Sequence, residues 1–330
     1  MKKLISICVP MYNESENIDA FYKQLTTTIK PLTQKYDFEF LFINDGSLDD
    51  SVNKVKDLTL VDSSVKLLDL SRNYGKEVAM AAGFDYCQGD AVITMDADLQ
   101  HPPKVILEMV EHWEAGYLDV YGKRNERKGE SFIKKKMSEM YYKLLIKFSK
   151  VEVLPGVGDY RLLDRVCIDS IIRIKETQRY TKGLYMWIGF RKKEVHFDAE
   201  ERFAGETKWK FMDLLKLGID GLTSNTTFPL KIAGILGGIL SVSSILYMVY
   251  ILISTLIYGT SVPGYPTLVT LILLLGGFQL ISLGIMGEYL GKIFHETKNR
   301  PLYFVQEYTG ETIELEKIQV PQRFAKTESV

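Results

Sequence analysis

The sequence has few cysteines and histidines and almost no net charge. Its three cysteines, Cys8, Cys87 and Cys167, lie far apart in apolar segments, and its net charge is -1. An odd number of cysteines without a CxxC pair argues against a disulfide framework and a zinc knuckle, and the four histidines show no metal-ligand spacing. We expect the cysteines to be buried small side chains in a reducing compartment. The balanced charge also excludes a nucleic-acid binder that depends on overall charge.

Several common enzyme motifs are missing as well. The sequences GxxxxGK[ST] and HExxH do not occur, and GxGxxG does not follow the first expected strand. P-loop, zinc-protease and dinucleotide-binding interpretations therefore lose their main supports. No serine occupies the strand-to-helix elbow that a Ser-His-Asp hydrolase needs. The apolar run at the N-terminus is too short for a signal peptide, so we expect the first domain to be cytoplasmic.

The first part of the chain alternates between expected strands and expected helices. Apolar runs predict strands at 4–9, 38–43, 65–70, 91–95 and 119–122. The segments between them predict helices at about 18–29, 49–58, 75–86 and 103–115. This order predicts right-handed βαβ crossovers and an α/β domain with a mostly parallel, Rossmann-like sheet. Ligands bind at the carboxyl edge of such sheets, and polar residues follow four of these strands, at 10–14, 44–46, 96–100 and 123–124.

The acidic motif after the fourth strand is the strongest candidate for a metal site. Side chains alternate along a strand, so Asp96 and Asp98 should point the same way, and Gln100 adds a neutral oxygen if the extended geometry persists. Oxygen ligands suit a hard divalent cation such as Mg²⁺ or Mn²⁺, which would clamp a diphosphate. The alternative is an acidic loop without a ligand.

The C-terminal part of the chain predicts association with a membrane. Two uncharged apolar runs predict transmembrane helices at about 230–257 and 267–290, since about 20 apolar residues span a bilayer. Cations flank their outer ends but not the turn between them, which places both long ends in the cytoplasm. Amphipathic stretches at about 130–150 and 210–227 predict membrane-surface helices, with solvated helices as the alternative. We therefore expect a cytoplasmic domain at 1–228, a hairpin at 229–291 and a cytoplasmic tail at 292–330.

Four motifs occur in an order that resembles a known family. They are VPMYNE at 9–14, INDGS at 43–47, DADLQ at 96–100 and RFAGETK at 202–208. Together they resemble family-2 glycosyltransferases of GT-A fold. More narrowly, they resemble polyprenyl-phosphate glycosyltransferases, which include dolichol-phosphate mannose synthases and bactoprenol glucosyltransferases. The two C-terminal apolar runs are similar to the bacterial branch.

The resemblance implies a role for each matching residue. The implied nucleotide-binding residues are Pro10, Tyr12, Asn13, Glu14, Asp45, Gly46, Lys76 and Asp96. The implied metal ligands for Mg²⁺ or Mn²⁺ are Asp96, Asp98 and Gln100. Candidates for binding the lipid phosphate and the leaving diphosphate are Arg124, Arg127, Arg202 and Lys208. Asp98 and Asp159 are the implied catalytic residues. Two alternatives remain open, because Lys76 could be a solvated helix start and Asp159 could cap a following helix.

The resemblance also implies a reaction. A sugar, glucose first and N-acetylglucosamine next, would move with inversion from a UDP-sugar to undecaprenyl phosphate at the cytoplasmic face of the membrane. A divalent cation would stabilise the charge that develops on the diphosphate. The partners are then the UDP-sugar, the lipid phosphate, the membrane and other copies of the chain, with a tetramer as one option. The alternatives are a polysaccharide-extending synthase, although its QxxRW-type motif is absent, and a membrane-anchored nucleotide-sugar sensor.

Overall fold

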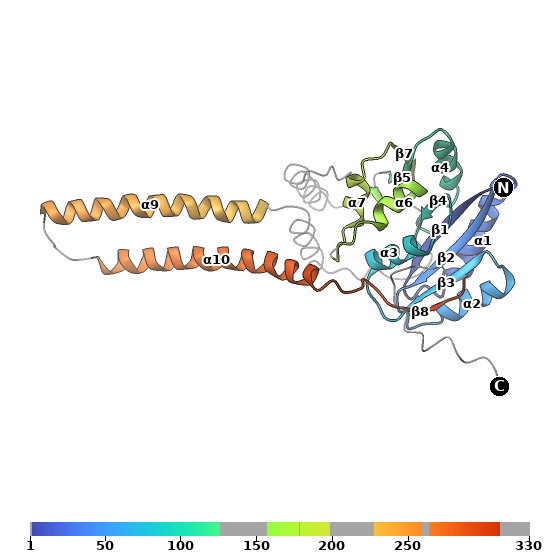
Figure 1. Cartoon of the computed structure of the whole chain (residues 1–330), viewed down its shortest axis with the longest axis horizontal. Coiled ribbons are helices and arrows are strands. Elements are labelled where there is room, and N and C mark those ends of the chain that lie inside the picture. The colour runs from blue at the N-terminus through green and yellow to red at the C-terminus, as the bar shows by residue number, and fades with distance from the viewer. Residues whose placement is uncertain (1, 126–156, 178, 199–227, 259–263, 311–330) are drawn as a thin grey trace. The chain divides into compact units, whose positions relative to one another are not determined.

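A computed structural model describes residues 2–125, 157–177, 179–198, 228–258 and 264–310. These residues form two units, an α/β domain that includes the segment after residue 299, and a pair of long apolar helices (Figure 1). The amphipathic stretches expected at 130–150 and 210–227 lie outside the described residues.

The α/β domain is built on an eight-stranded sheet with the order β7-β5-β6-β4-β1-β2-β3-β8. The strands are β1 (Lys3–Met11), β2 (Tyr36–Asn44), β3 (Val65–Leu70), β4 (Ala91–Thr94), β5 (Asp119–Arg124), β6 (Val157–Asp164), β7 (Lys192–Phe197) and β8 (Val305–Tyr308). The central strands β4, β1, β2 and β3 are parallel, as are β5 and β7. Antiparallel pairing joins β6 to β4 and β5, and β8 to β3. The expected α/β class with a mostly parallel sheet is confirmed.

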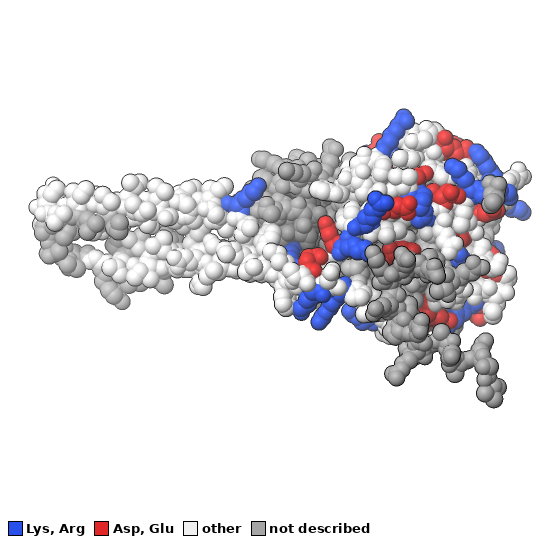
Figure 2. Space-filling view, in the orientation of Figure 1, with Lys and Arg blue, Asp and Glu red and all other residues white. Residues whose placement is uncertain are grey.

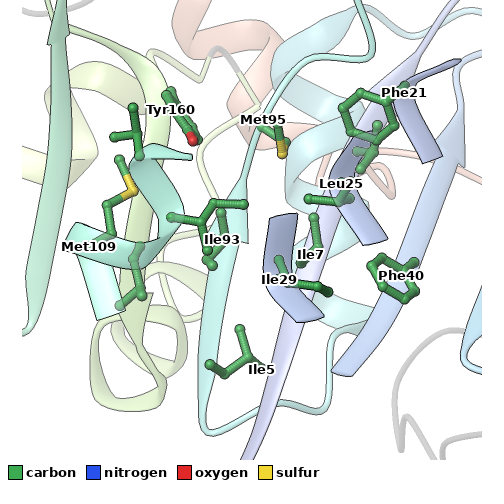
Figure 3. Packing of buried hydrophobic residues seen from close by; sticks show 14 of the residues in the cluster. Ile5, Ile7, Phe21, Leu25, Ile29, Phe40, Ile93, Met95, Met109 and Tyr160 are labelled. Carbon is green, nitrogen blue, oxygen red and sulfur yellow. The ribbon is translucent and has the colours of Figure 1, made fainter. Parts of the chain in front are cut away.

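Helices cover both faces of the sheet. On one face lie α1 (Ile18–Ile29), which continues into η1 (Lys30–Gln34), α2 (Ser51–Val61) and α4 (Val105–Glu114). On the other face lie α3 (Lys76–Tyr86), α6 (Arg165–Ile172) and α7 (Thr181–Trp187). The alternation of β1 explains the two cores, because Ile5 and Ile7 belong to the first and Cys8 to the second. Figure 3 shows Ile7 beside Leu25 of α1 in the first core.

The structure corrects four sequence-based expectations. The strand β6 (Val157–Asp164), which the sequence did not predict, pairs with β4 inside the sheet. The first strand, expected at 4–9, begins at Lys3 and continues through Pro10 to Met11. The strands β7 and β8 were not predicted, since their sequences are largely polar and β8 lies in the segment expected to be a tail. The fourth strand, expected at 91–95, ends at Thr94, so the extended geometry on which the placement of Gln100 depended does not persist.

The second unit consists of α9 (Phe228–Tyr258) and α10 (Tyr265–Thr297), which run side by side (Figure 1). Within them, Leu230–Tyr258 and Leu274–Thr297 are 29 and 24 residues long, and both segments are apolar enough to cross a membrane. On the face seen in Figure 2, charged side chains are nearly absent from the length of both helices. Membrane crossing and its orientation remain predictions.

Candidate functional site

The topology of the sheet brings the predicted polar segments to one edge. In the parallel strands β1 and β2, Met11 pairs with Asn44, so the segments that follow both strands leave the sheet together. In β4, Thr94 pairs with Cys8 of β1 on one side and with Arg161 of β6 on the other. Because β6 is antiparallel to β4, the residues before Arg161 lie toward the end where β4 leaves the sheet. Asp159 is thereby placed near the acidic motif that follows β4.

Asp45 joins the loop after β2 to the loop before α3. Its carboxylate accepts hydrogen bonds from the backbone N–H groups of Tyr74 at 2.7 Å and Gly75 at 2.9 Å. Gly46 has a φ of +70°, and a Cβ atom there would lie 2.5 Å from the backbone nitrogen of Asn73. Only glycine combines this conformation with so close an approach. The Asp-Gly pair therefore fixes the loop from which Lys76 projects.

The loop after β1 is tied to the loop after β2. The backbone N–H of Asn13 donates to Ser47 Oγ at 2.9 Å, and the Asn13 side chain accepts from the backbone N–H of Leu48 at 2.8 Å. The backbone N–H of Glu14 donates to Ser51 Oγ at 3.0 Å. Tyr12 keeps 44% of its surface exposed. The loop thus presents an aromatic ring at the carboxyl edge while its backbone is held in place.

Lys76 is at the centre of a charge cluster at this edge. Its Nζ atom lies 2.7 Å from Oδ1 and 2.8 Å from Oδ2 of Asp96, and 3.2 Å from Oδ2 of Asp159. Burial acts to lower the pKa of Lys76, but the charges of Asp96 and Asp159 raise it above its ordinary value. Burial acts to raise the pKa of Asp96, but the charge of Lys76 lowers it below its ordinary value. Both partners are therefore charged at neutral pH.

The acidic motif after β4 forms a turn rather than an extended segment. Leu99 has a φ of +61°, and Asp98 accepts a hydrogen bond at 3.1 Å from the backbone N–H of Gln100. Asp98 is buried and Asp96 is partly exposed, and both lie beyond the end of β4 at Thr94, so strand alternation does not determine where their carboxylates point. Within the described parts of the chain, no three His, Cys, Asp or Glu side chains are grouped as in a metal site.

His101 supports the backbone of the acidic motif. Its Nδ1 atom accepts a hydrogen bond of 3.3 Å from the backbone N–H of Asp96, and its ring stacks on Tyr160 with centroids 4.8 Å apart. Burial lowers the pKa of His101, so the ring is neutral at neutral pH. Because Nδ1 is the acceptor, Nε2 carries the proton. His101 therefore positions Asp96 rather than offering a free nitrogen to a metal ion.

Asp159 belongs to β6 and does not cap a helix. The cap of α6 is Asp164, whose carboxylate accepts from the backbone N–H of Val166 at 3.0 Å. The Thr94 hydroxyl donates to the backbone carbonyl of Asp159 and fixes its position beside β4. Among the described residues, the buried Oδ1 atom of Asp159 has no hydrogen-bond partner, whereas Oδ2 faces Lys76. One oxygen of this acid is therefore available to a ligand.

Comparison with known proteins decides the family. Residues 6–172 match the model of glycosyl transferase family 2. The chain belongs to glycosyltransferase family 2. Its curated relatives include the putative glycosyltransferase CsbB of Bacillus subtilis, 45% identical over 92% of each chain. A bactoprenol glucosyl transferase of Shigella phage SfII is 40% identical over 92% of this chain and 97% of its own.

A weaker likeness exists to a solved structure. The mannosyltransferase PcManGT from Pyrobaculum calidifontis, in complex with GDP-Man and Mn²⁺, has a TM-score of 0.44 and 16% identity, covering 62% of this chain and 58% of its own. The family match and the mixed sheet confirm the expected GT-A fold and the expectation that the protein is a glycosyltransferase. Family membership also favours the enzyme over the nucleotide-sugar sensor.

The structure of this family-2 glycosyltransferase brings several predicted residues together, notably Lys76, Asp96 and Asp159. Asp45 contacts the loop that carries Lys76. Arg124 ends β5, and the predicted cations Arg127, Arg202 and Lys208 lie outside the described residues. The roles given to all these residues remain predictions.

Sequence reasoning missed two residues that support the site. His101 directly follows the acidic motif, a position that could have drawn attention to it. Glu77 follows Lys76, and its carboxylate accepts from the backbone N–H of Thr181 at 2.9 Å and from the Thr181 hydroxyl. Its partner lies far along the chain in α7, so no local pattern signals this contact.

Proposed function

We propose that this glycosyltransferase moves a sugar, with glucose as the first choice, from a UDP-sugar to a polyprenyl phosphate at the cytoplasmic face of a membrane. The observation that carries the proposal is the meeting of Lys76, Asp96 and Asp159 at the carboxyl edge of a family-2 domain. The chain also has two apolar helices long enough to cross a membrane. Similarity to the phage bactoprenol glucosyl transferase supports the acceptor and the sugar.

The side chains at this edge have the chemistry that a divalent cation requires. Asp96 and Asp98, with Gln100, would hold Mg²⁺ or Mn²⁺ through hard oxygen ligands. The ammonium of Lys76 already contacts both oxygens of Asp96, so these oxygens are directed at a positive charge. When bound, the cation would stabilise the negative charge that develops on the leaving diphosphate.

Asp159 is proposed to face the acceptor. An oxygen of the lipid phosphate forms a bond to the anomeric carbon while the bond from that carbon to the diphosphate breaks, and the electron pair leaves with UDP. A phosphate that arrives as a monoanion gives its remaining proton to Asp159, whose buried Oδ1 has no partner among the described residues. A single displacement inverts the anomeric centre, so an α-linked donor gives a β-linked product.

Cations are proposed to offset the repulsion between the acceptor and the donor. Arg124 ends β5, and the nearby sequence supplies Arg127, whereas Arg202 and Lys208 come from a later loop. Arginine suits this role because its guanidinium binds phosphate oxygens in pairs. The nucleotide would lie along Pro10, Tyr12 and the tied loops described above.

A panel of donors tests this proposal. The full-length protein in detergent is incubated with UDP-glucose, UDP-N-acetylglucosamine, UDP-galactose or GDP-mannose, each with and without polyprenyl phosphate, and nucleotide release is measured. We expect release from UDP-glucose that depends on the lipid phosphate and stops when EDTA removes divalent cations. Polyprenol, which lacks the phosphate, is the matched control and should be inactive. Saturable binding of the donor without turnover in the presence of the lipid phosphate would contradict the proposal.

A further inference from the structure

The Lys76 ammonium contacts the carboxylate of Asp96, which is a proposed ligand of the divalent cation. It contacts both carboxylate oxygens of Asp96 and also reaches Asp159, so three oxygens from two acids surround one positive charge. These acids come from different parts of the sheet, the turn after β4 and the strand β6. A divalent cation on the same oxygens would compete directly with the ammonium, because both need the negative charge of Asp96.

The backbone around Lys76 is fixed, while its side chain is long enough to change partners. Gly75, the residue before it, donates its backbone N–H to Asp45 at 2.9 Å. Glu77, the residue after it, accepts two hydrogen bonds from Thr181. The ammonium itself is on a flexible four-carbon stem with three rotatable donors. It can therefore leave Asp96 without any movement of α3.

We propose that Lys76 is the counter-ion of Asp96 before the donor binds, and that a divalent cation binds Asp96 only by displacing this ammonium. The inference rests on the proposed function, since it assumes that the cation of that reaction binds at Asp96. A cation arriving alone must then leave the ammonium without its main partner. When the cation arrives with a nucleoside diphosphate, the diphosphate provides a new anionic partner for the ammonium. Lys76 thus makes metal binding depend on the nucleotide.

Another lysine shows what an ordinary ion pair looks like in this domain. Lys54 of α2 lies 2.7 Å from Asp19 of α1, contacting one oxygen of one acid. The Asp19 side chain is 65% exposed, whereas those of Asp96 and Asp159 are 28% and 12% exposed. Exposed single pairs of this kind contribute little. Lys54 is therefore a matched control for the loss of a paired lysine at a place without a proposed metal ligand.

Binding of Mn²⁺ alone tests the inference without any sugar transfer. The full-length wild-type protein and the variants Lys76→Gln and Lys54→Gln are titrated with Mn²⁺ in the absence of nucleotide, and free Mn²⁺ is measured by electron paramagnetic resonance. We expect Lys76→Gln to bind Mn²⁺ at least about tenfold more tightly than wild type, because a unit positive charge within contact distance of the ligand is gone. Lys54→Gln should match wild type. Adding Asp96→Asn to Lys76→Gln should remove the gain.

A second measurement follows the dependence on nucleotide. UDP should tighten Mn²⁺ binding strongly in the wild-type protein and by a clearly smaller factor in Lys76→Gln, because the variant has no ammonium to relocate. If Lys76→Gln does not fold, Lys76→Met, which keeps most of the apolar stem, takes its place. Equal or weaker binding of Mn²⁺ alone by a folded Lys76 variant would overturn the inference, as would the absence of Mn²⁺ binding by every protein tested.

The outcome is separable from that of the donor panel. Lipid-dependent sugar transfer by the wild type, together with unchanged Mn²⁺ affinity in Lys76→Gln, overturns the counter-ion role and leaves the proposed reaction standing. Tighter Mn²⁺ binding in Lys76→Gln, together with no transfer from any donor, supports the counter-ion role and overturns the proposed reaction.

Discussion

Two charge clusters share the strand β6 and differ in their access to solvent. Asp159 contacts Lys76 at the edge of the sheet, where the lysine side chain is 44% exposed. Two residues further along, Arg161 contacts Asp119 of β5 at 3.0 Å, and these side chains are 3% and 0% exposed. The same strand thus carries an open cluster and a closed one.

The closed cluster is a buried ion pair that packs against an aromatic ring. One nitrogen of Arg161 contacts both oxygens of Asp119, and its guanidinium carbon lies 3.7 Å from the ring centroid of Tyr185. Burial raises the pKa of Asp119 above its ordinary value, and the charge of Arg161 offsets only part of this effect. A pair without access to solvent cannot exchange partners, whereas Lys76 can. The two clusters therefore differ in solvent exposure rather than in the number of charges, and exposure distinguishes the candidate reactive site from the closed cluster, which is structural.

The largest expected effect comes from Asp96→Asn in the open cluster. Sugar transfer should fall about a thousandfold, since a proposed ligand of the charge-stabilising cation is neutralised. The melting temperature should change by no more than a few degrees, because the side chain is partly exposed and asparagine keeps its shape. Lipid-dependent UDP release and thermal unfolding are measured on the same preparation.

The control for that variant is Asp19→Asn, which neutralises the partner of Lys54 on the surface of α1. It should retain wild-type activity. If Asp96→Asn keeps more than about a tenth of the activity, the open cluster is no more functional than this surface pair.

The next effect is on stability and comes from Arg161→Met in the closed cluster. Removing the guanidinium leaves the Asp119 carboxylate buried without its charge partner, which should lower the free energy of unfolding by about 3 to 5 kcal/mol. The double variant with Asp119→Leu should recover part of this loss, because it removes the unpaired charge as well. Denaturant unfolding of the detergent-solubilised protein measures both. A loss below about 1 kcal/mol would mean that the closed pair is no scaffold.

The smallest expected effect comes from Tyr185→Phe beneath Arg161. Among the described residues, the buried Tyr185 hydroxyl has no hydrogen-bond partner, so its removal breaks no bond within that part of the chain. The free energy of unfolding should change by less than about 1 kcal/mol. Tyr185→Leu should cost more, because the aromatic face under the guanidinium is lost. Equal losses of unfolding free energy in the two variants would show that the Tyr185 ring does not stabilise the closed cluster.

Much of the fold could be predicted from the sequence, because local patterns determine it. The expected strand at 65–70 coincides with β3 and the expected helix at 18–29 with α1, and the other four expected strands and three expected helices occur with shifted ends. The strand β6 was missed because glycines near its start are typical of a loop. The strand β8 was missed because an edge strand needs little apolar sequence, and its pairing with β3 involves residues distant in the chain.

The candidate site was only partly predictable for the same reason. The carboxyl ends of parallel strands meet at one edge of a sheet. The sequence therefore correctly placed Asp45 and Asp96 at one edge, since both follow parallel strands. The contact of Lys76 with Asp159 depends on an antiparallel strand that the sequence did not reveal. The turn at Leu99, directly after Asp98, depends on a positive φ at a residue type that rarely adopts one.

The most direct test of the central claim compares Asp159→Asn with Arg161→Met, two changes separated by one residue on one strand. Turnover of UDP-glucose with polyprenyl phosphate is measured per folded molecule, at a temperature where both variants are folded. We predict that Asp159→Asn loses at least about a hundredfold in turnover with a wild-type melting temperature. Arg161→Met should melt earlier but keep its turnover within about tenfold of wild type. Full turnover by Asp159→Asn, or its loss in Arg161→Met alone, would contradict the assignment of chemistry to the open cluster.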